Sequence, residues 1–186
     1  MIGAASLLMI MDISASDLPD AEVDYVVSRF REACMHGQAT FGPGQVKAIQ
    51  PKDLHSDVRW SYGHIDDAKY YQLTLSKPAY LVVWDHKPQG EYYTKGCAVV
   101  AQGLPFAPTW EKVLNTRFSA TQRSRFIEVE TRYGQVEFPL PEEGKKLYVG
   151  RIGTFVKLQV ATMSKEETGD WKLRQSIKRN PVNSRK

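Results

Sequence analysis

The side chains best suited to chemistry stand at the predicted start of a short helix over residues 97–101. Thr94 can act as its N-cap, and Lys95, Gly96 and Cys97 follow directly. The first N–H groups of a helix have no partner within the helix and attract anions, and Lys95 would add a full positive charge beside them. The sequence therefore predicts an anion site formed by Thr94, Lys95, Gly96 and Cys97.

Four carboxylates, Asp66, Asp67, Asp85 and Glu91, precede this predicted helix. Carboxylate oxygens are the ligands that Mg²⁺ prefers, and a bound cation can stabilise the charge that develops in phosphodiester cleavage. We expect Asp66, Asp67 and Glu91 to be catalytic, with Asp66 and Asp67 holding Mg²⁺ or Mn²⁺. Isolated surface carboxylates are common, so solvated side chains are the alternative.

Cys97 allows two interpretations. A thiolate at a helix start beside Lys95 would be stabilised and reactive, whereas a small apolar residue in an apolar element would be buried and inert. We favour the buried residue. Cys34 and Cys97 lie far apart in the sequence without metal-ligand spacing, which favours reduced thiols in a cytoplasm.

A strand over 80–84, a turn and a second strand over 91–94 are predicted ahead of the 97–101 helix. The segment 65–75, which carries Lys69 and the aspartates, is predicted to be helical. Further helices are predicted over 23–34 and over 110–115, the latter capped by Thr109, and a further strand over 46–49.

Beyond residue 126 the pattern changes from helical to alternating. Strands are predicted over 127–133, 136–140, 147–149 and 154–161. In the last strand one face is expected to carry Val156, Leu158 and Val160, and the other Lys157 and Gln159. The predicted fold class is α+β, with a mainly antiparallel C-terminal sheet portion.

The length of 186 residues suits one domain, which we expect to cover 1–163, followed by a basic, mobile tail over 164–186. The apolar segment 2–10 is too short to span a bilayer and lacks a preceding basic residue, so it is expected to be a strand.

The positive charge is unevenly placed. Residues 164–186 contain seven basic and three acidic residues, which accounts for the whole net charge of +4. Two stretches, 112–125 and 171–186, carry basic residues and no acid. Basic and aromatic side chains together suit nucleic acid, whereas a solubilising tail is the alternative. The residues expected to contact nucleic acid are Arg117, Arg123, Arg125, Lys172, Arg174, Lys178 and Arg179.

The order of strand, turn, Gly-acidic-Tyr strand, Gly-Cys and small apolar helix resembles the ParB/sulfiredoxin superfamily. In that superfamily a Gly-Cys-His-Arg motif opens a helix that holds nucleotide phosphates, and here the motif reads Gly96-Cys97-Ala98-Val99. The segment 65–73 is similar to the helix that carries a nucleotide-contacting lysine, and Lys69 falls on that lysine. The resemblance covers about residues 46–104 and implies a ParB/sulfiredoxin-like core with ATP as cofactor.

Size and the basic C-terminal end extend the resemblance to the plasmid fertility-inhibition proteins of this superfamily. It implies an ATPase and metal-dependent DNase that blocks conjugative or T-DNA transfer. The implied partners are the transferring DNA strand, nucleotide and components of the conjugation machinery. The alternative is a binding module for DNA or the transfer machinery that keeps the fold without catalysis.

Overall fold

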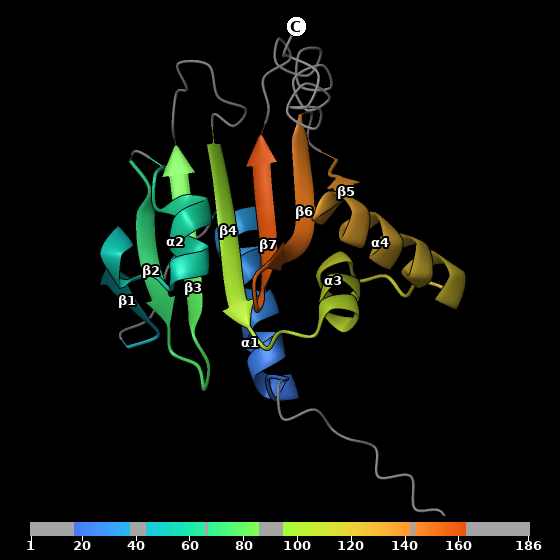
Figure 1. Cartoon of the computed structure of the whole chain (residues 1–186), viewed down its shortest axis with the longest axis horizontal. Helices are drawn as coiled ribbons and strands as arrows, with labels where there is room; N and C mark the ends of the chain where they lie inside the picture. The colour runs from blue at the N-terminus through green and yellow to red at the C-terminus, as the bar shows by residue number, and fades with distance from the viewer. Residues whose placement is uncertain (1–16, 38–43, 66, 86–94, 142–143, 163–186) are drawn as a thin grey trace, which may run out of the picture.

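The computed structural model describes residues 17–37, 44–65, 67–85, 95–141 and 144–162. These residues form a seven-stranded antiparallel sheet in the order β1-β2-β3-β4-β7-β6-β5, with helices on both faces (Figure 1). The strands are β1 Val46–Ile49, β2 Lys69–Leu73, β3 Ala79–Asp85, β4 Lys95–Gln102, β5 Gln135–Pro139, β6 Lys145–Ile152 and β7 Phe155–Thr162. The helices are α1 Asp20–Phe30, α2 Ser56–Tyr62, α3 Phe106–Leu114 and α4 Ala120–Tyr133. The α+β fold class is therefore confirmed.

Each face of the sheet has its own hydrophobic core. On one face, α1 buries Val26 and Phe30, and α3 buries Trp110, against the sheet. On the opposite face, α2 buries Val58 and Tyr62 against β2, β3 and β4. The central strands are buried on both faces, which is why β4 reads as a continuous apolar run rather than an alternating one.

The predicted helix over 97–101 is wrong, because this segment is part of the central strand β4. Short apolar runs suit a buried strand and a buried helix equally well, so periodicity alone could not decide between them. Gly96 serves packing in this strand: a Cβ added there would lie 2.0 Å from the Trp84 ring. The helix start on which the predicted anion site depends is therefore absent from the described residues.

The predicted helix over 65–75 is also wrong. Residues 69–73 form β2, which pairs with β1 and β3. Asp67 has φ 61°, a left-handed conformation that a right-handed helix cannot contain. Tyr70 is buried, and its hydroxyl donates to the Tyr62 carbonyl at 2.8 Å, so the strand is tied to α2.

The strand predicted over 127–133 is wrong as well, because these residues form the second half of α4. Ile127 and Val129 alternate with glutamates and thereby imitate a half-buried strand. The helix instead turns Phe126, Val129 and Glu130 inward at helical spacing. It ends at Gly134, which has φ 78°.

The remaining predicted elements are confirmed where the structure describes them. α1 and the π-helical turn Arg31–Met35 correspond to the helix predicted over 23–34. β1, β3, β5, β6 and β7 correspond to the strands predicted over 46–49, 80–84, 136–140, 147–149 and 154–161. In β7, Val156, Leu158 and Val160 share one face, as predicted, and this face packs in the core that contains α1 and α3. The helix predicted over 110–115 exists, but it begins at Phe106 after Pro105 instead of at Thr109.

Cys34 and Cys97 form a disulfide with a Cα–Cα distance of 5.1 Å, so the prediction of reduced thiols is wrong. The bond joins the C-terminal end of the first helical segment to β4 across 63 residues. Sequence spacing could not reveal it, because only the folded sheet brings the two cysteines together. Burial of Cys97 is confirmed.

The strands predicted over 2–10 and 91–94 and the tail over 164–186 lie outside the described residues. In the part of the chain that the structure describes, no helix is long and apolar enough to cross a membrane.

Candidate nucleic-acid interface

α4 stands out from the rest of the molecule at the β5 end of the sheet (Figure 1). Among its 14 residues only Glu130 is buried, while Phe126 and Val129 pack partly against the core. Most of its first two turns face solvent. A helix placed in this way is open to a partner along its N-terminal half.

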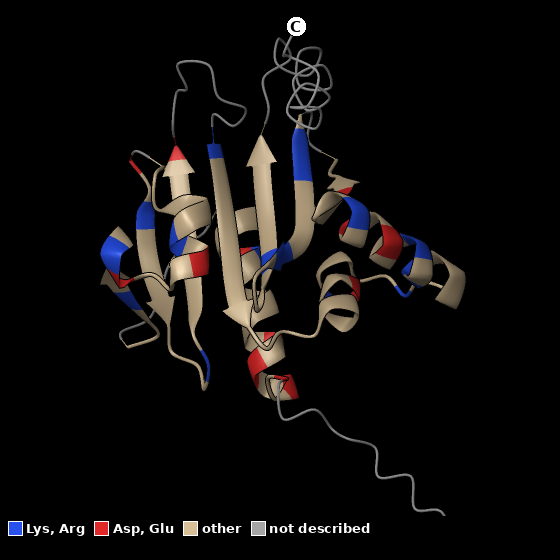
Figure 2. Cartoon of the chain, viewed as in Figure 1, with Lys and Arg blue, Asp and Glu red and all other residues tan. Residues whose placement is uncertain are grey.

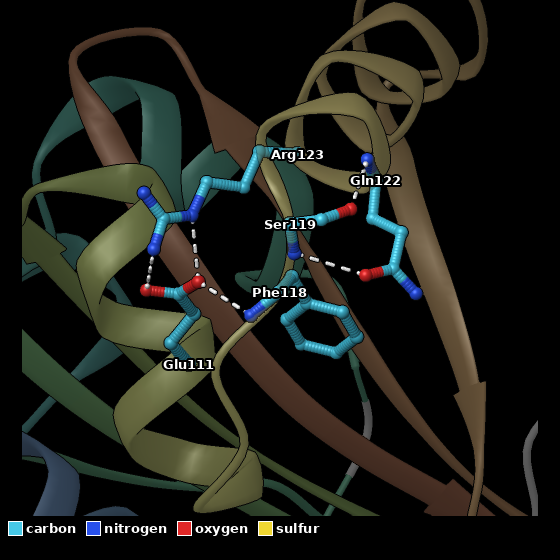
Figure 3. Close-up of polar contacts among 5 residues, drawn as sticks. All are labelled: Glu111, Phe118, Ser119, Gln122 and Arg123. Atoms are coloured by element: carbon cyan, nitrogen blue, oxygen red, sulfur yellow. Dashed lines mark hydrogen bonds and ion pairs between the residues drawn. The ribbon is translucent and has the colours of Figure 1, made fainter.

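A capping box starts α4. The Ser119 hydroxyl accepts a hydrogen bond from the Gln122 N–H at 3.3 Å, and the Gln122 side chain accepts one from the Ser119 N–H at 2.9 Å (Figure 3). Two of the otherwise unpaired N–H groups near the helix start are thereby satisfied. The Ser-x-x-Gln spacing is visible in the sequence and was the missed signal for this helix.

Glu111 on α3 fixes the orientation of α4. Its carboxylate accepts from Arg123 Nε at 2.7 Å and Nη2 at 3.0 Å, and from the Phe118 N–H at 3.0 Å (Figure 3). The Phe118 N–H, and after it Arg123, hold the pKa of Glu111 below its usual value. A bidentate ion pair of this kind fixes geometry as well as charge, so the α3–α4 connection is held in one arrangement.

Four aromatic rings pack beneath this connection. Trp110 of α3 stacks on Phe118 with ring centroids 4.9 Å apart and meets Phe126 of α4 edge-on at 5.0 Å. Phe126 also contacts Phe138 of β5 at 5.4 Å. Such pairs add directional packing to their buried area. α3, α4 and β5 therefore form one unit.

The α3–α4 connection and the start of α4 carry basic residues only. Residues 112–127 contain Lys112, Arg117, Arg123 and Arg125 and no acid, whereas α4 as a whole carries both basic and acidic positions (Figure 2). Arg117 and Arg125 are exposed, whereas Arg123 is engaged by Glu111 and Lys112 forms an ion pair with Asp24 at 2.6 Å. Of the three predicted arginines, two are thus available to a ligand and one is a structural residue.

The residues of the predicted nucleotide site lie elsewhere. Lys69 is the exposed first residue of β2 and stands opposite Val83. Lys95 begins β4 and forms an exposed ion pair with Asp85 at 3.7 Å. The two lysines thus lie on either side of β3, near the same end of the sheet.

Gly96 and Cys97 serve ring packing and the disulfide respectively, and Asp67 is exposed just before β2. In the described part of the chain, no three His, Cys, Asp or Glu side chains gather closely enough to hold a metal ion. The predicted site residues outside that part are Asp66, Glu91, Thr94, Lys172, Arg174, Lys178 and Arg179.

Comparison of the chain with protein-family models, with curated proteins and with solved structures finds no match.

Proposed function

We propose that this protein binds DNA, with α4 as the contacting helix. The observation that carries the proposal is the projecting, acid-free start of α4. There Arg125 on the helix and Arg117 in the preceding loop are exposed, while Glu111 holds the helix in place. Exposed arginines can neutralise phosphates, and a fixed helix can keep them in register with the DNA backbone.

The dimensions of α4 suit duplex DNA. An α-helix with its side chains is about 10–12 Å across, and the major groove of B-DNA is about 12 Å wide. In helix-turn-helix proteins the second helix of a pair lies in this groove and contacts bases through its N-terminal residues. α4 follows α3 in the chain, and Thr121, Gln122 and Arg125 are exposed near its start.

The proposal is for binding without cleavage, which corresponds to the non-catalytic alternative. The phosphate-holding helix start expected at Thr94 to Cys97 has no helix to support it, because Lys95–Gln102 is a strand. Hydrolysis of ATP and Mg²⁺-dependent DNA cleavage remain predictions of the resemblance. Incubating the full chain with ATP, plasmid DNA and Mg²⁺ tests them.

The resemblance to plasmid fertility-inhibition proteins supplies the biological setting of the proposal. A protein that occupies transferring DNA, or the machinery that handles it, would lower the frequency of conjugative transfer. The seven basic residues of 164–186 would add attraction that does not depend on DNA sequence. Their deletion is expected to weaken binding to every duplex by a similar factor.

The experiment is a comparison of two charge-matched double variants. Arg117→Glu with Arg125→Glu removes the exposed arginines, while Lys47→Glu with Lys52→Glu makes the same charge change at exposed positions near the β1 edge. By fluorescence anisotropy with a labelled duplex, we expect the arginine variant to lose about tenfold or more in affinity and the lysine variant about threefold or less. Equal losses would show that only net charge matters and that α4 is not the contact.

A further inference from the structure

A groove of about 740 Å³ lies on the α2 face of the sheet, between α2 and the strands β5, β6 and β7. Its volume is in the range of small-molecule sites. It is separate from the exposed start of α4, and all of its lining residues are described. Its charged lining residues are Asp57, Arg151 and Lys157. Trp60 and Tyr62 from α2, Gln135 from β5 and Gln159 from β7 line it as well.

Hydrogen bonds fix the floor of this groove. Lys157 Nζ donates to Gln135 Oε1 at 2.8 Å, and the Tyr62 hydroxyl donates to Gln159 Oε1 at 2.8 Å. Lys157 and Gln135 both stand opposite Gly150, which lies on the strand between them. A Cβ added at Gly150 would collide with the Gly134 carbonyl oxygen and lie 2.9 Å from Gln135 Cβ, so glycine is required beside Gln135.

The ammonium group of Lys157 lacks a carboxylate partner within ion-pair distance among the described residues. Burial lowers its pKa to about 8, and the charge of Glu137 opposes that shift. Glu137 itself forms an ion pair with Lys146 at 3.2 Å. A lysine has three N–H donors, and one neutral acceptor holds this one. The groove therefore presents a half-buried cation with N–H donors to spare.

Trp60 supplies a flat apolar wall to the same groove. Its side chain is 85% exposed, more than any other large hydrophobic side chain in the described residues. An indole face attracts planar rings, and covering it removes a large apolar area from water. The Trp60 ring and the half-buried Lys157 ammonium thus line the same groove.

We propose that this groove binds a small molecule that combines a flat ring with one anionic group, the ring resting on Trp60 and the anion meeting Lys157. The site is independent of the proposed DNA contact, since α4 contributes no lining residue. Tyr62, Gln135 and Gln159 hold the floor in position.

Pyridoxal 5′-phosphate is a suitable probe, because it joins a flat ring, an anion and an aldehyde. At about pH 8 a neutral lysine amine adds to the aldehyde carbon, and water leaves as a C=N bond forms. Borohydride then delivers a hydride to that bond, solvent supplies the proton, and a stable secondary amine results. Peptide mapping by mass spectrometry identifies the labelled lysines, with the exposed Lys47 and Lys52 as internal references.

We expect Lys157 to be labelled about tenfold faster than Lys47 and Lys52. In Trp60→Ala, which changes an exposed side chain, its labelling should slow about fivefold while the references stay unchanged. Adenosine monophosphate and benzoate, used as competitors without an aldehyde, should distinguish a phosphate from a carboxylate ligand by which one protects Lys157. Labelling of Lys157 no faster than Lys47, an unchanged rate in Trp60→Ala, or protection by neither competitor would overturn the proposal.

Discussion

Gly96 lies in β4 at a position where any side chain would collide with the Trp84 ring. As part of a Gly-Cys motif it was expected to let a helix approach phosphate, whereas in the sheet it makes room for Trp84. Trp84 is 4% exposed and packs near Tyr62, with ring centroids 5.9 Å apart, so it has little room to move. The requirement for glycine here comes from ring packing.

Gly96→Ala is therefore expected to destabilise the protein by about 2–3 kcal/mol, because the new methyl group collides with a fixed ring. Gly134→Ala is the matched control: it has φ 78° and nothing within 4 Å of the added Cβ, so only the cost of a left-handed backbone, roughly 1–2 kcal/mol, remains. Urea unfolding measures both changes. A Gly96→Ala protein as stable as the wild type would show that Trp84 does not constrain this position.

At the scale of elements, Glu111 links α3 to α4. Its side chain is half-buried, and its lowered pKa comes first from the Phe118 N–H and then from Arg123. A depressed carboxyl pKa contributes stability above the unfolded value near 4.5, and this contribution is lost as pH falls through the folded value.

In Glu111→Gln, we expect the amides of α4 to exchange with solvent several-fold faster at neutral pH, because a neutral amide cannot replace the bidentate ion pair. As the pH falls below 4.5 and through the lowered pKa of Glu111, the difference from the wild type should shrink, since the wild-type carboxyl becomes protonated. Hydrogen exchange followed by mass spectrometry gives both results. Glu128→Gln, an exposed change on the same helix, is the control. If the α4 amides exchanged equally fast in the wild type and in Glu111→Gln, Glu111 would not hold α4 in place.

The disulfide between Cys34 and Cys97 ties the helical layer to the centre of the sheet. Closing a loop of 63 residues restricts the unfolded chain, which corresponds to about 4 kcal/mol in the chain-entropy account. Adding reductant should therefore lower the unfolding temperature of the wild type. The same reductant should not change the unfolding temperature of the double variant Cys34→Ser, Cys97→Ser. If the wild type had the same unfolding temperature with and without reductant, the disulfide would not stabilise the fold.

Elements were predicted correctly where the residue pattern is compatible with only one type of secondary structure. Val156, Leu158 and Val160 alternate with polar residues, and their face was predicted correctly. The run after Gly96 did not reveal its structure, because small apolar residues suit the interior of either element. In α4 the alternation of Ile127 and Val129 outweighed the Ser119 capping box, although the capping box was the more specific signal.

At the scale of the molecule, the sheet order could not be read from the sequence. β4 pairs with β7, whose residues lie about 60 positions away, and no local signal encodes that pairing. The same pairing sets Lys157, which lines the groove beside α2, opposite Val100. Of the predicted nucleic-acid residues in the described part, Arg117 and Arg125 are exposed as required, whereas the partner of Arg123 became visible only in the fold.

Binding of DNA by α4 is the central claim, and its salt dependence tests it most directly. The logarithm of the binding constant for a duplex, plotted against the logarithm of salt concentration, has a slope of about −0.9 for each phosphate neutralised. We predict that Arg117→Ala with Arg125→Ala lowers the magnitude of this slope by about 2, while Lys47→Ala with Lys52→Ala leaves it unchanged. Absence of binding by the wild type, or the same slope in the arginine variant and the wild type, would contradict the account.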